Sequence, residues 1–240
     1  MKAMIMAAGL GSRLGALTKN LPKALIPVGS GTMLDLVVEK LKAAGVDELI
    51  INLHYRGQQI RDHVAQKKSY GLRVEFSEEP EILGTGGGLR KVEHFFRSEK
   101  EFFVHNCDVY SDLDLREVVA AQRASSAIGT LVVLTRVQSS YLVFDSNLSL
   151  IGWEMANGSA RDFAREEVQA KSYCYTGIRM YTPEIFEYMR HEPAHFSVIP
   201  TYINAVRAGK LIKAFPIDTH YWIDMGTPDN LKELEAKLKG

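Results

Sequence analysis

The sequence predicts an α/β fold in which a mostly parallel β-sheet carries helices on both faces and is followed by a β-rich C-terminal half. In the first half of the chain, short apolar runs alternate with segments whose apolar residues recur at helical spacing. This alternation is typical of parallel strands joined by crossover helices. After Ala127, runs rich in β-branched and aromatic residues follow one another.

The first half begins with an apolar run over residues 2–7, which predicts a buried strand. Residues 33–44 place Leu34, Val37 and Leu41 on one helical face, and Gly45 ends that helix. Further strands are expected at 48–53, 72–77 and 102–105, and further helices at 58–67, 88–96 and 115–124.

The second half predicts a different order of elements. Strands are expected at 128–135, 141–144, 173–181 and 211–216, and helices at 183–190, 198–208 and 228–239. The polar segment 157–171 is expected to be an excursion from the sheet. Because no Pro/Gly/Ser-rich linker, internal repeat or low-complexity tract divides the chain, we expect a single domain over residues 1–240, with halves at 1–126 and 127–240.

Composition narrows the kind of partner. Lys plus Arg and Asp plus Glu both number 29, so the formal net charge is zero. A protein that neutralises many nucleic-acid phosphates would carry a basic surplus, so no nucleic-acid partner is expected and an anionic ligand must meet a few placed cations. Two cysteines give no disulfide framework, no apolar run is long enough to cross a bilayer, and the apolar start of the chain is too short for a signal-peptide core. We therefore expect a reduced, cytoplasmic protein with no membrane partner.

A glycine-rich loop follows the first predicted strand, at the sheet edge where open parallel sheets bind ligands. It is not the dinucleotide fingerprint, because Leu14 stands where that pattern needs its third glycine, and no Gly-Lys-Ser/Thr closes a Walker A loop. Pro22 and Pro27 are expected to keep the following backbone extended. Exposed loop amides together with Arg13 and Lys23 supply what a triphosphate cradle needs.

Two carboxylates are candidate ligands for Mg²⁺. Asp108 comes just after the predicted strand at 102–105, again at the carboxyl edge of the sheet, and Asp224 stands between Ile223 and Met225. Carboxylate oxygens are the donors that this hard cation prefers.

The motifs taken together resemble the nucleotide-sugar pyrophosphorylases, also called sugar-1-phosphate nucleotidylyltransferases. The matching segments are AAGLGSRL at 7–14, PKALIP at 22–27, GTGGG at 84–88, NCD at 106–108, YTGI at 175–178 and WIDMGT at 222–227. They occur in the family's order over nearly the whole chain. The compact length and the triple glycine are most similar to short bacterial members, such as the N-acetylmuramate-1-phosphate uridylyltransferases and the mannose- or heptose-1-phosphate guanylyltransferases.

The resemblance implies a Rossmann-like fold with a nucleotide-binding half and a sugar-binding C-terminal half. It also implies transfer of a nucleotidyl group from a nucleoside triphosphate to a sugar 1-phosphate, with release of pyrophosphate and with Mg²⁺ as cofactor. The residues implied are Arg13 and Lys23 for catalysis, Ala8, Gly9, Gly11, Thr85, Gly86 and Gly87 for the nucleotide, Glu154 and Gly177 for the sugar, and Asp108 and Asp224 for the metal. Asn52 and Glu79 are further candidates for the base pocket, on loops.

Two departures from the family pattern leave questions open. Ala16 stands where the family usually has proline, and the Glu-Lys-Pro that supplies a lysine for the sugar phosphate is missing. The cation that holds the acceptor phosphate is therefore undecided, with Lys171 and Arg179 as candidates. The nucleobase, the sugar and the oligomeric state are also left open.

Two other functions are considered. A cytidylyltransferase for phosphocholine or a similar small phospho-alcohol would need an aromatic cage for the cation. Tyr141, Trp153, Tyr173 and Tyr175 are the candidates for that cage. A noncatalytic nucleotide-sugar sensor is disfavoured, because both candidate catalytic cations and both candidate metal ligands are present.

Overall fold

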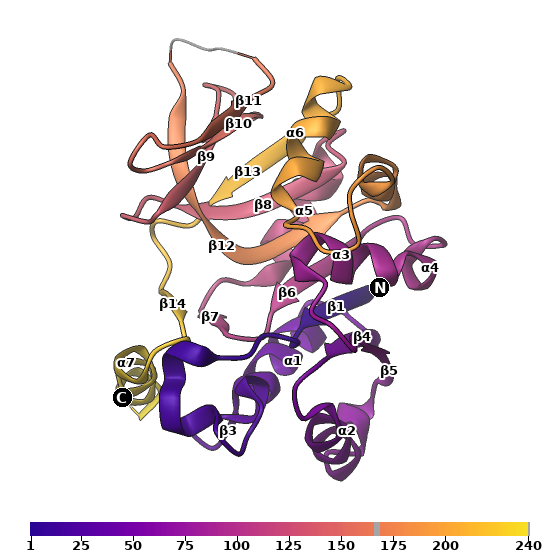
Figure 1. Ribbon diagram of the computed structural model, residues 1–240, viewed down its shortest axis with the longest axis vertical. Helices are drawn as coiled ribbons and strands as arrows, with labels where there is room; N and C mark the ends of the chain where they lie inside the picture. Colours follow the sequence, from indigo (N-terminus) through magenta and orange to yellow (C-terminus); the bar gives the residue numbers. More distant parts are fainter. Residues whose placement is uncertain (166–168, 240) are drawn as a thin grey trace.

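The first half of the chain forms a parallel sheet with helices on both faces, as expected (Figure 1). The structure is a computed structural model that describes residues 1–165 and 169–239. The strands of this half are β1 Lys2–Met6, β4 Glu48–Leu53, β5 Arg73–Glu78 and β6 Phe102–Asn106, in the order β5-β4-β1-β6, all parallel. Its helices are α1 Met33–Ala43, α2 Gly57–Gln66, α3 Gly84–Lys91, α4 Glu93–Phe96 and α5 Leu115–Ala124.

The second half extends the same sheet with mainly antiparallel strands. These are β8 Gly129–Leu134, β9 Ser140–Phe144, β10 Leu150–Met155, β11 Arg161–Phe163, β12 Lys171–Tyr181 and β13 Ile212–Pro216. The long strand β12 pairs with β6 of the first half and with β8 and β9 of the second, so one sheet runs through both halves. The 3₁₀-helix η4 Pro183–Met189 and helix α6 Ile199–Arg207 follow β12.

Two short ladders and the last helix lie beside the main sheet. Strand β7 Val109–Ser111 pairs with β14 Trp222–Asp224, and β2 Pro27–Val28 pairs with β3 Gly31–Thr32. Helix α7 Pro228–Lys239 packs against both ladders, near the 3₁₀ segment η1 Ser12–Thr18 that follows the glycine-rich loop. Leu14, Ile223 and Leu231 belong to this small core. The far end of the chain therefore supports the loop after β1.

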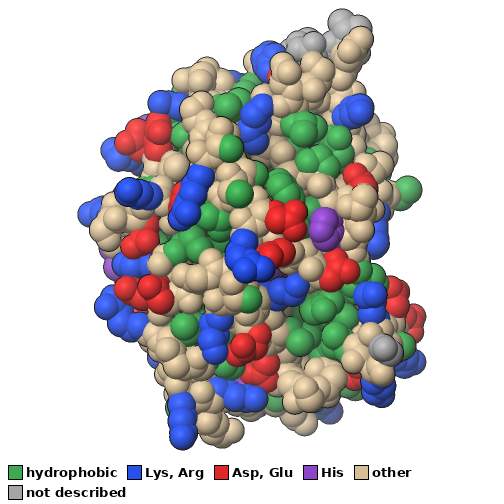
Figure 2. All heavy atoms as spheres, turned by 180° about the vertical axis from the view of Figure 1, so that it is seen from behind, with side chains coloured by type: hydrophobic (Ala, Val, Ile, Leu, Met, Phe, Trp, Pro, Cys, Tyr) green, Lys and Arg blue, Asp and Glu red, His purple; other side chains and the backbone are tan. Residues whose placement is uncertain are grey.

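Both faces of the sheet are apolar, and the apolar side of each helix packs against one of them, which forms two cores. One core contains Leu34, Val37 and Leu41 of α1 together with apolar residues of α2 and α5. The other contains Phe95 and Phe96 of α4 together with residues of η4 and α6. In the part of the chain that the structure describes, no helix has the length and apolar character needed to cross a membrane. The rear face mixes side chains of both signs, in keeping with the zero net charge (Figure 2).

Three expectations about local structure need correction. The helix expected at 88–96 begins four residues earlier, at Gly84, and breaks at Val92 into α3 and α4. The backbone after Pro22 is not extended throughout, because Lys23–Leu25 forms a single 3₁₀ turn (η2). Three strands were not predicted from the sequence. Strand β10 contains a glycine within its apolar run, and β7 and β11 are only three residues long. Strand β11 lies within the polar excursion at 157–171, of which residues 166–168 fall outside the described chain.

Candidate active site

Two buried polar side chains hold the loop after β1 in place. The backbone N–H of Ala7 donates to Asn52 Oδ1 at 2.6 Å, and Asn52 Nδ2 donates to Glu79 Oε1 at 2.7 Å. The other oxygen of Glu79 accepts from the backbone N–H of Leu83 at 2.9 Å, just before α3. The sequence predicted Asn52 on a loop, but it lies within strand β4. The two side chains therefore link three segments that meet at the carboxyl ends of the parallel strands.

Glycine is required at one position of the loop and leaves another open. Gly11 has a φ of +66°, and a Cβ there would lie 2.8 Å from Thr18 Cγ2 and 3.1 Å from Lys23 Cβ. Thr18 Oγ1 donates to the carbonyl of Gly11 at 3.2 Å, which closes the loop over Lys23. A Cβ on Gly9 would meet nothing within 4 Å. The loop is therefore packed on the Lys23 side and free on the Gly9 side.

Each candidate catalytic cation pairs with a candidate metal ligand. Lys23, whose side chain is 8 % exposed, forms an ion pair with Asp108. Arg13 Nη2 lies 3.1 Å from Asp224 Oδ2. A Cβ on Gly226 would lie 2.5 Å from Arg13 Nη2, so glycine makes room for the guanidinium. The four charges form two neutral pairs.

The short β7–β14 ladder brings the two aspartates together across a long stretch of sequence. Asp224 is opposite Val109, the residue after Asp108, and the backbone N–H of Met225 donates to the carbonyl of Asp108 at 2.7 Å. Two ligands of one ion must lie close together, and the ladder brings the backbones of these two residues together, while their binding of metal stays a prediction. Among the described residues, no group of three or more His, Cys, Asp and Glu side chains is placed to hold a metal ion.

Two cavities meet at these residues. The first has a volume of about 210 Å³ and the second about 320 Å³. Asn106 and Asp108 line both. The first is also lined by Ala8, Gly9, Gly11, Lys23, Asn52, Glu79, Gly84 and Thr85, and the second by Arg13, Gln138, Ser140, Tyr175, Thr176, Gly177, Trp222 and Asp224. The arrangement can hold two ligands side by side with charged groups at their junction.

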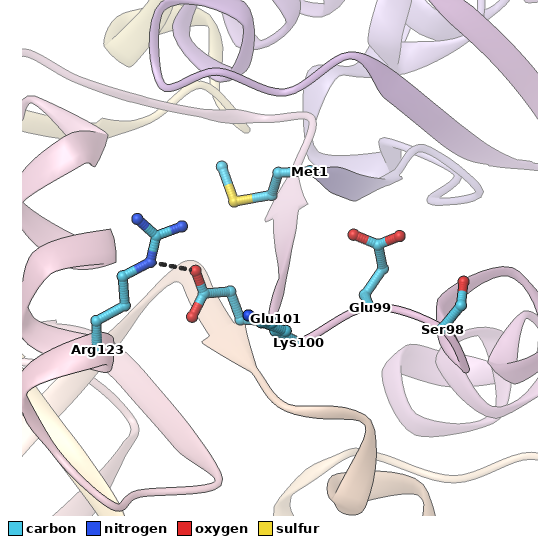
Figure 3. Close-up of a pocket in the computed structure, with 6 residues that line it drawn as sticks. All are labelled: Met1, Ser98, Glu99, Lys100, Glu101 and Arg123. Carbon is cyan, nitrogen blue, oxygen red and sulfur yellow. Dashed lines mark hydrogen bonds and ion pairs between the residues drawn. The ribbon is translucent and has the colours of Figure 1, made fainter.

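A larger hollow lies at the opposite end of the strands. Its volume is about 640 Å³, and its lining includes Met1, Glu99, Glu101 and Arg123 (Figure 3). Met1 and Glu101 directly precede β1 and β6, and Arg123 Nε donates to Glu101 at 2.6 Å. Because open α/β sheets bind ligands beyond the carboxyl ends of their strands, we assign the active site to the two smaller cavities.

The glycines at the start of α3 divide into two groups. Gly84 and Thr85 line the first cavity. A Cβ on Gly86 would lie 2.3 Å from Phe196 Cε2, and one on Gly87 would lie 2.3 Å from the carbonyl oxygen of Ala194. The backbone N–H groups of Gly86 and Gly87 both donate to the carbonyl of Phe196, at 3.0 and 3.4 Å. The absence of side chains at these two glycines thus makes room for the segment before α6. Their contact with a base stays a prediction, and both of their backbone N–H groups are already engaged by Phe196.

The candidate sugar ligands lie in different surroundings. Gly177 has a φ of +87° and lines the second cavity, where a Cβ would press on Asn106 Nδ2 at 2.9 Å. Glu154, on β10, accepts from Ser172 Oγ at 2.9 Å and lies outside the lining of both cavities. Lys171 is exposed at the start of β12, and Arg179 is fully buried behind the site.

The residues suggested for an aromatic cage do not gather around the cavity. Tyr173 is buried in the core against Phe144. Tyr175 lines the second cavity, but the guanidinium carbon of Arg179 lies 5.4 Å from the centre of its ring. A cation already at that ring disfavours a second one.

Sequence reasoning gave no role to several residues that line the site. Asn106 ends β6 beside Asp108, and Gln138, Ser140 and Thr176 add neutral polar groups to the second cavity. Two signals pointed to Asn106: it directly follows the strand predicted at 102–105, and it belongs to the NCD segment at 106–108 that resembles the family. Cys107 is buried, and burial together with Asp108 raises the pKa of its thiol far above the ordinary range, which excludes it as a thiolate nucleophile.

Comparison with known proteins identifies the class. The chain belongs to the nucleotidyl transferase family, whose model matches residues 2–239. A UTP–glucose-1-phosphate uridylyltransferase of Synechocystis is 28 % identical over 99 % of this chain and 63 % of its own length. A mannose-1-phosphate guanyltransferase of Schizosaccharomyces pombe is 31 % identical over 95 % of this chain and 61 % of its own. The chain thus spans little more than three fifths of these curated relatives.

Solved structures share the fold. A Bacillus anthracis protein described as a glucose-1-phosphate thymidylyltransferase superposes with a TM-score of 0.83 at 21 % identity, covering 99 % of this chain and 94 % of its own. The inositol-1-phosphate CTP transferase of T. maritima gives 0.78 at 17 % identity, covering 99 % and 96 %. At these identities the likeness shows the fold alone.

Proposed function

We propose that this protein transfers a nucleotidyl group from a nucleoside triphosphate to a sugar 1-phosphate and releases pyrophosphate. The observation that carries the proposal is the pair of cavities that share Asn106 and Asp108. One is lined by the glycine-rich loop and Lys23, as a nucleotide site requires, and the other by neutral polar groups suited to sugar hydroxyls. The family match and the names of the curated relatives support the same chemistry.

In this proposal the acceptor phosphate attacks the α-phosphorus, the new P–O bond forms, and the bond to pyrophosphate breaks in line. The acceptor is already an anion, so the protein needs to align the reactants and neutralise charge. Lys23 would hold the α-phosphate or the acceptor phosphate. Arg13 would hold the leaving pyrophosphate, which its planar guanidinium can grip bidentately. The loop amides from Ala8 to Gly11 would contact the triphosphate.

We also propose that Asp108 and Asp224 hold Mg²⁺. The donor set fits, because this ion takes one or two carboxylates and completes its shell with phosphate oxygens and water. When bound, the ion would neutralise charge on the phosphates. Both carboxylates line the second cavity, and both carry a cation partner that phosphate groups could take over.

The two halves are proposed to act as one domain, with residues 1–126 holding the nucleotide and 127–240 the sugar. The continuous sheet through β6 and β12 supports this. We place the reaction in the cytoplasm, where nucleoside triphosphates are made, and the two free cysteines suit that compartment. A phosphocholine acceptor gains no support, because Arg179 already faces the ring of Tyr175.

The direct test is pyrophosphate release over a matrix of the common nucleoside triphosphates and sugar 1-phosphates, beginning with glucose 1-phosphate and mannose 1-phosphate. We expect one pairing to exceed the others and to depend on Mg²⁺. Phosphocholine serves as the competing acceptor. Release with phosphocholine alone, or with none of the acceptors, would contradict the proposal.

A further inference from the structure

Arg179 is a buried cation without a carboxylate partner. Its side chain is completely excluded from solvent on β12, and no ion pair joins it to an acidic residue among residues 1–165 and 169–239. Its Nη1 donates to Asn106 Oδ1 at 3.2 Å and to the hydroxyl of Tyr175, while Nε and Nη2 have no hydrogen-bond partner among the described residues. A buried charge with unmet donors is costly, so its presence requires a reason other than stability.

The side-chain amide of Asn106, which accepts from Arg179, stands at the junction of the two cavities. Arginine has only donors, so the oxygen of the Asn106 amide must face it. The nitrogen then faces the other way, toward Gly177, whose missing side chain leaves the space open. No residue in the described part of the chain accepts a hydrogen bond from Asn106 Nδ2. A fixed N–H donor is therefore directed into the second cavity.

The charge balance around the junction indicates what this donor meets. Lys23 and Arg13 are each neutralised by an aspartate, whereas Arg179 is not. A guanidinium in a low-dielectric interior polarises the amide that accepts from it and makes its N–H groups stronger donors toward an anion. An anionic oxygen is the partner that gains most from such a donor.

We propose that Asn106 binds a phosphate oxygen of the acceptor through Nδ2, and that Arg179 is the positioning residue that fixes this orientation. The inference rests on the proposed function for the identity of the acceptor. It also explains how the phosphate is held without a direct contact from Lys171 or Arg179. Arg179 acts through Asn106 and does not reach the cavity itself.

The test measures binding of inorganic phosphate to the full chain by NMR, followed at the side-chain amide signal of Asn106. Arg179→Met removes the charge at similar length, Asn106→Ala removes the donor, and the double variant combines them. Arg123→Met is the matched control, since Arg123 lies in the hollow at the amino ends of the strands (Figure 3). Affinity in Asn106→Ala is followed by calorimetry, and thermal unfolding is recorded for every variant.

We expect Arg179→Met and Asn106→Ala each to weaken phosphate binding by about 10- to 100-fold, the range expected for one hydrogen bond to a charged group. The double variant should be no weaker than the worse single variant, because both lose the same contact. Arg179→Met should unfold at the same or a higher temperature, and Arg123→Met should bind phosphate normally.

Unchanged phosphate affinity in a folded Arg179→Met variant would overturn the inference, as would losses that multiply in the double variant. If Arg179→Met unfolds, Arg179→Lys decides: it keeps the charge but lacks the planar guanidinium whose Nη1 reaches both Asn106 and Tyr175, so it should fold and still bind more weakly than wild type. The proposed function fails separately, through absence of pyrophosphate release in the wild-type protein. Phosphate binding that depends on both residues would stand in that case.

Discussion

Replacing Gly86 by alanine tests whether the start of α3 is a packing site. A Cβ would lie 2.3 and 2.5 Å from two ring carbons of Phe196. That ring is 5 % exposed and has the Arg90 guanidinium 5.0 Å from its centre, so it has little room to move. Overpacking costs about 1–3 kcal/mol, and the helix propensity of alanine returns at most about 1 kcal/mol. Contacts this short with a ring that has little room to move place the cost in the upper part of that range. We therefore expect a net loss of about 1–2 kcal/mol, or a fall in Tm of about 2–8 °C for a chain of this size.

The assay pairs thermal unfolding with triphosphate kinetics in two glycine variants. Gly86→Ala should lower Tm and leave the Michaelis constant for the triphosphate near the wild-type value. Gly9→Ala should leave Tm unchanged and raise the Michaelis constant, because its Cβ would meet none of the described residues within 4 Å but would stand on the open side of the loop. Phe196→Leu should restore part of the stability of Gly86→Ala by making space. A folded Gly86→Ala enzyme with unchanged Tm and a raised Michaelis constant would refute the packing argument and favour a base contact.

Three further predictions concern the charged groups. Lys23→Ala and Arg13→Lys should lower turnover, the first by about 10²–10³-fold, the loss typical of a group that stabilises transition-state charge, as measured by pyrophosphate release; normal turnover in both would remove them from the site. Asp108→Asn and Asp224→Asn should each weaken Mg²⁺-dependent turnover, with a double variant less impaired than the product of the two losses, and fully multiplicative losses would show that they do not share an ion. Burial lowers the pKa of His105 to about 4, below its unfolded value near 6.5. As the pH falls, the unfolded chain therefore takes up a proton before the folded one does. The free energy of unfolding should drop by up to about 3 kcal/mol between pH 6.5 and 4. Denaturant midpoints should show a shallower drop in His105→Gln, and identical pH profiles would contradict the assignment.

The strands of the first half could be predicted because a strand buried on both faces appears in the sequence as a short continuous apolar run. Few other elements give that pattern. Strand β4 was predicted at its observed bounds, and helix α5 likewise. The same logic placed Asp108 at the carboxyl edge of the sheet. Strand β10 was missed because Gly152 interrupts its apolar run, and only the antiparallel pairing of β10 with β9 and β11 makes the segment a strand.

The glycine run at 84–88 shows where local rules gave the wrong boundary. Glycine disfavours a helix interior, so a helix was expected to begin after the run. Tertiary packing reverses this, because α3 lies so close to the segment containing Phe196 that side chains at Gly86 and Gly87 would collide with it. That contact joins two segments far apart in the sequence, so it cannot be predicted from the glycine run alone. The same limitation hid the contact between Arg179 and Asn106, which lie on different strands.

The pairing of charges in the site explains how a chain with no net charge can be built for highly charged ligands. Lys23, whose side chain is 8 % exposed, would be poorly placed as a free cation, since a desolvated charge needs a partner. Arg13 is 61 % exposed and therefore depends less on its pair with Asp224. Asp108 and Asp224 supply those partners in the structure described here. A phosphate can take over a cation without leaving its aspartate unpaired only if another positive charge reaches that aspartate, and a divalent cation arriving with the triphosphate would do so. In the proposed mechanism, the same four side chains form two neutral pairs and would become ligands when the charges of substrate and metal arrive together.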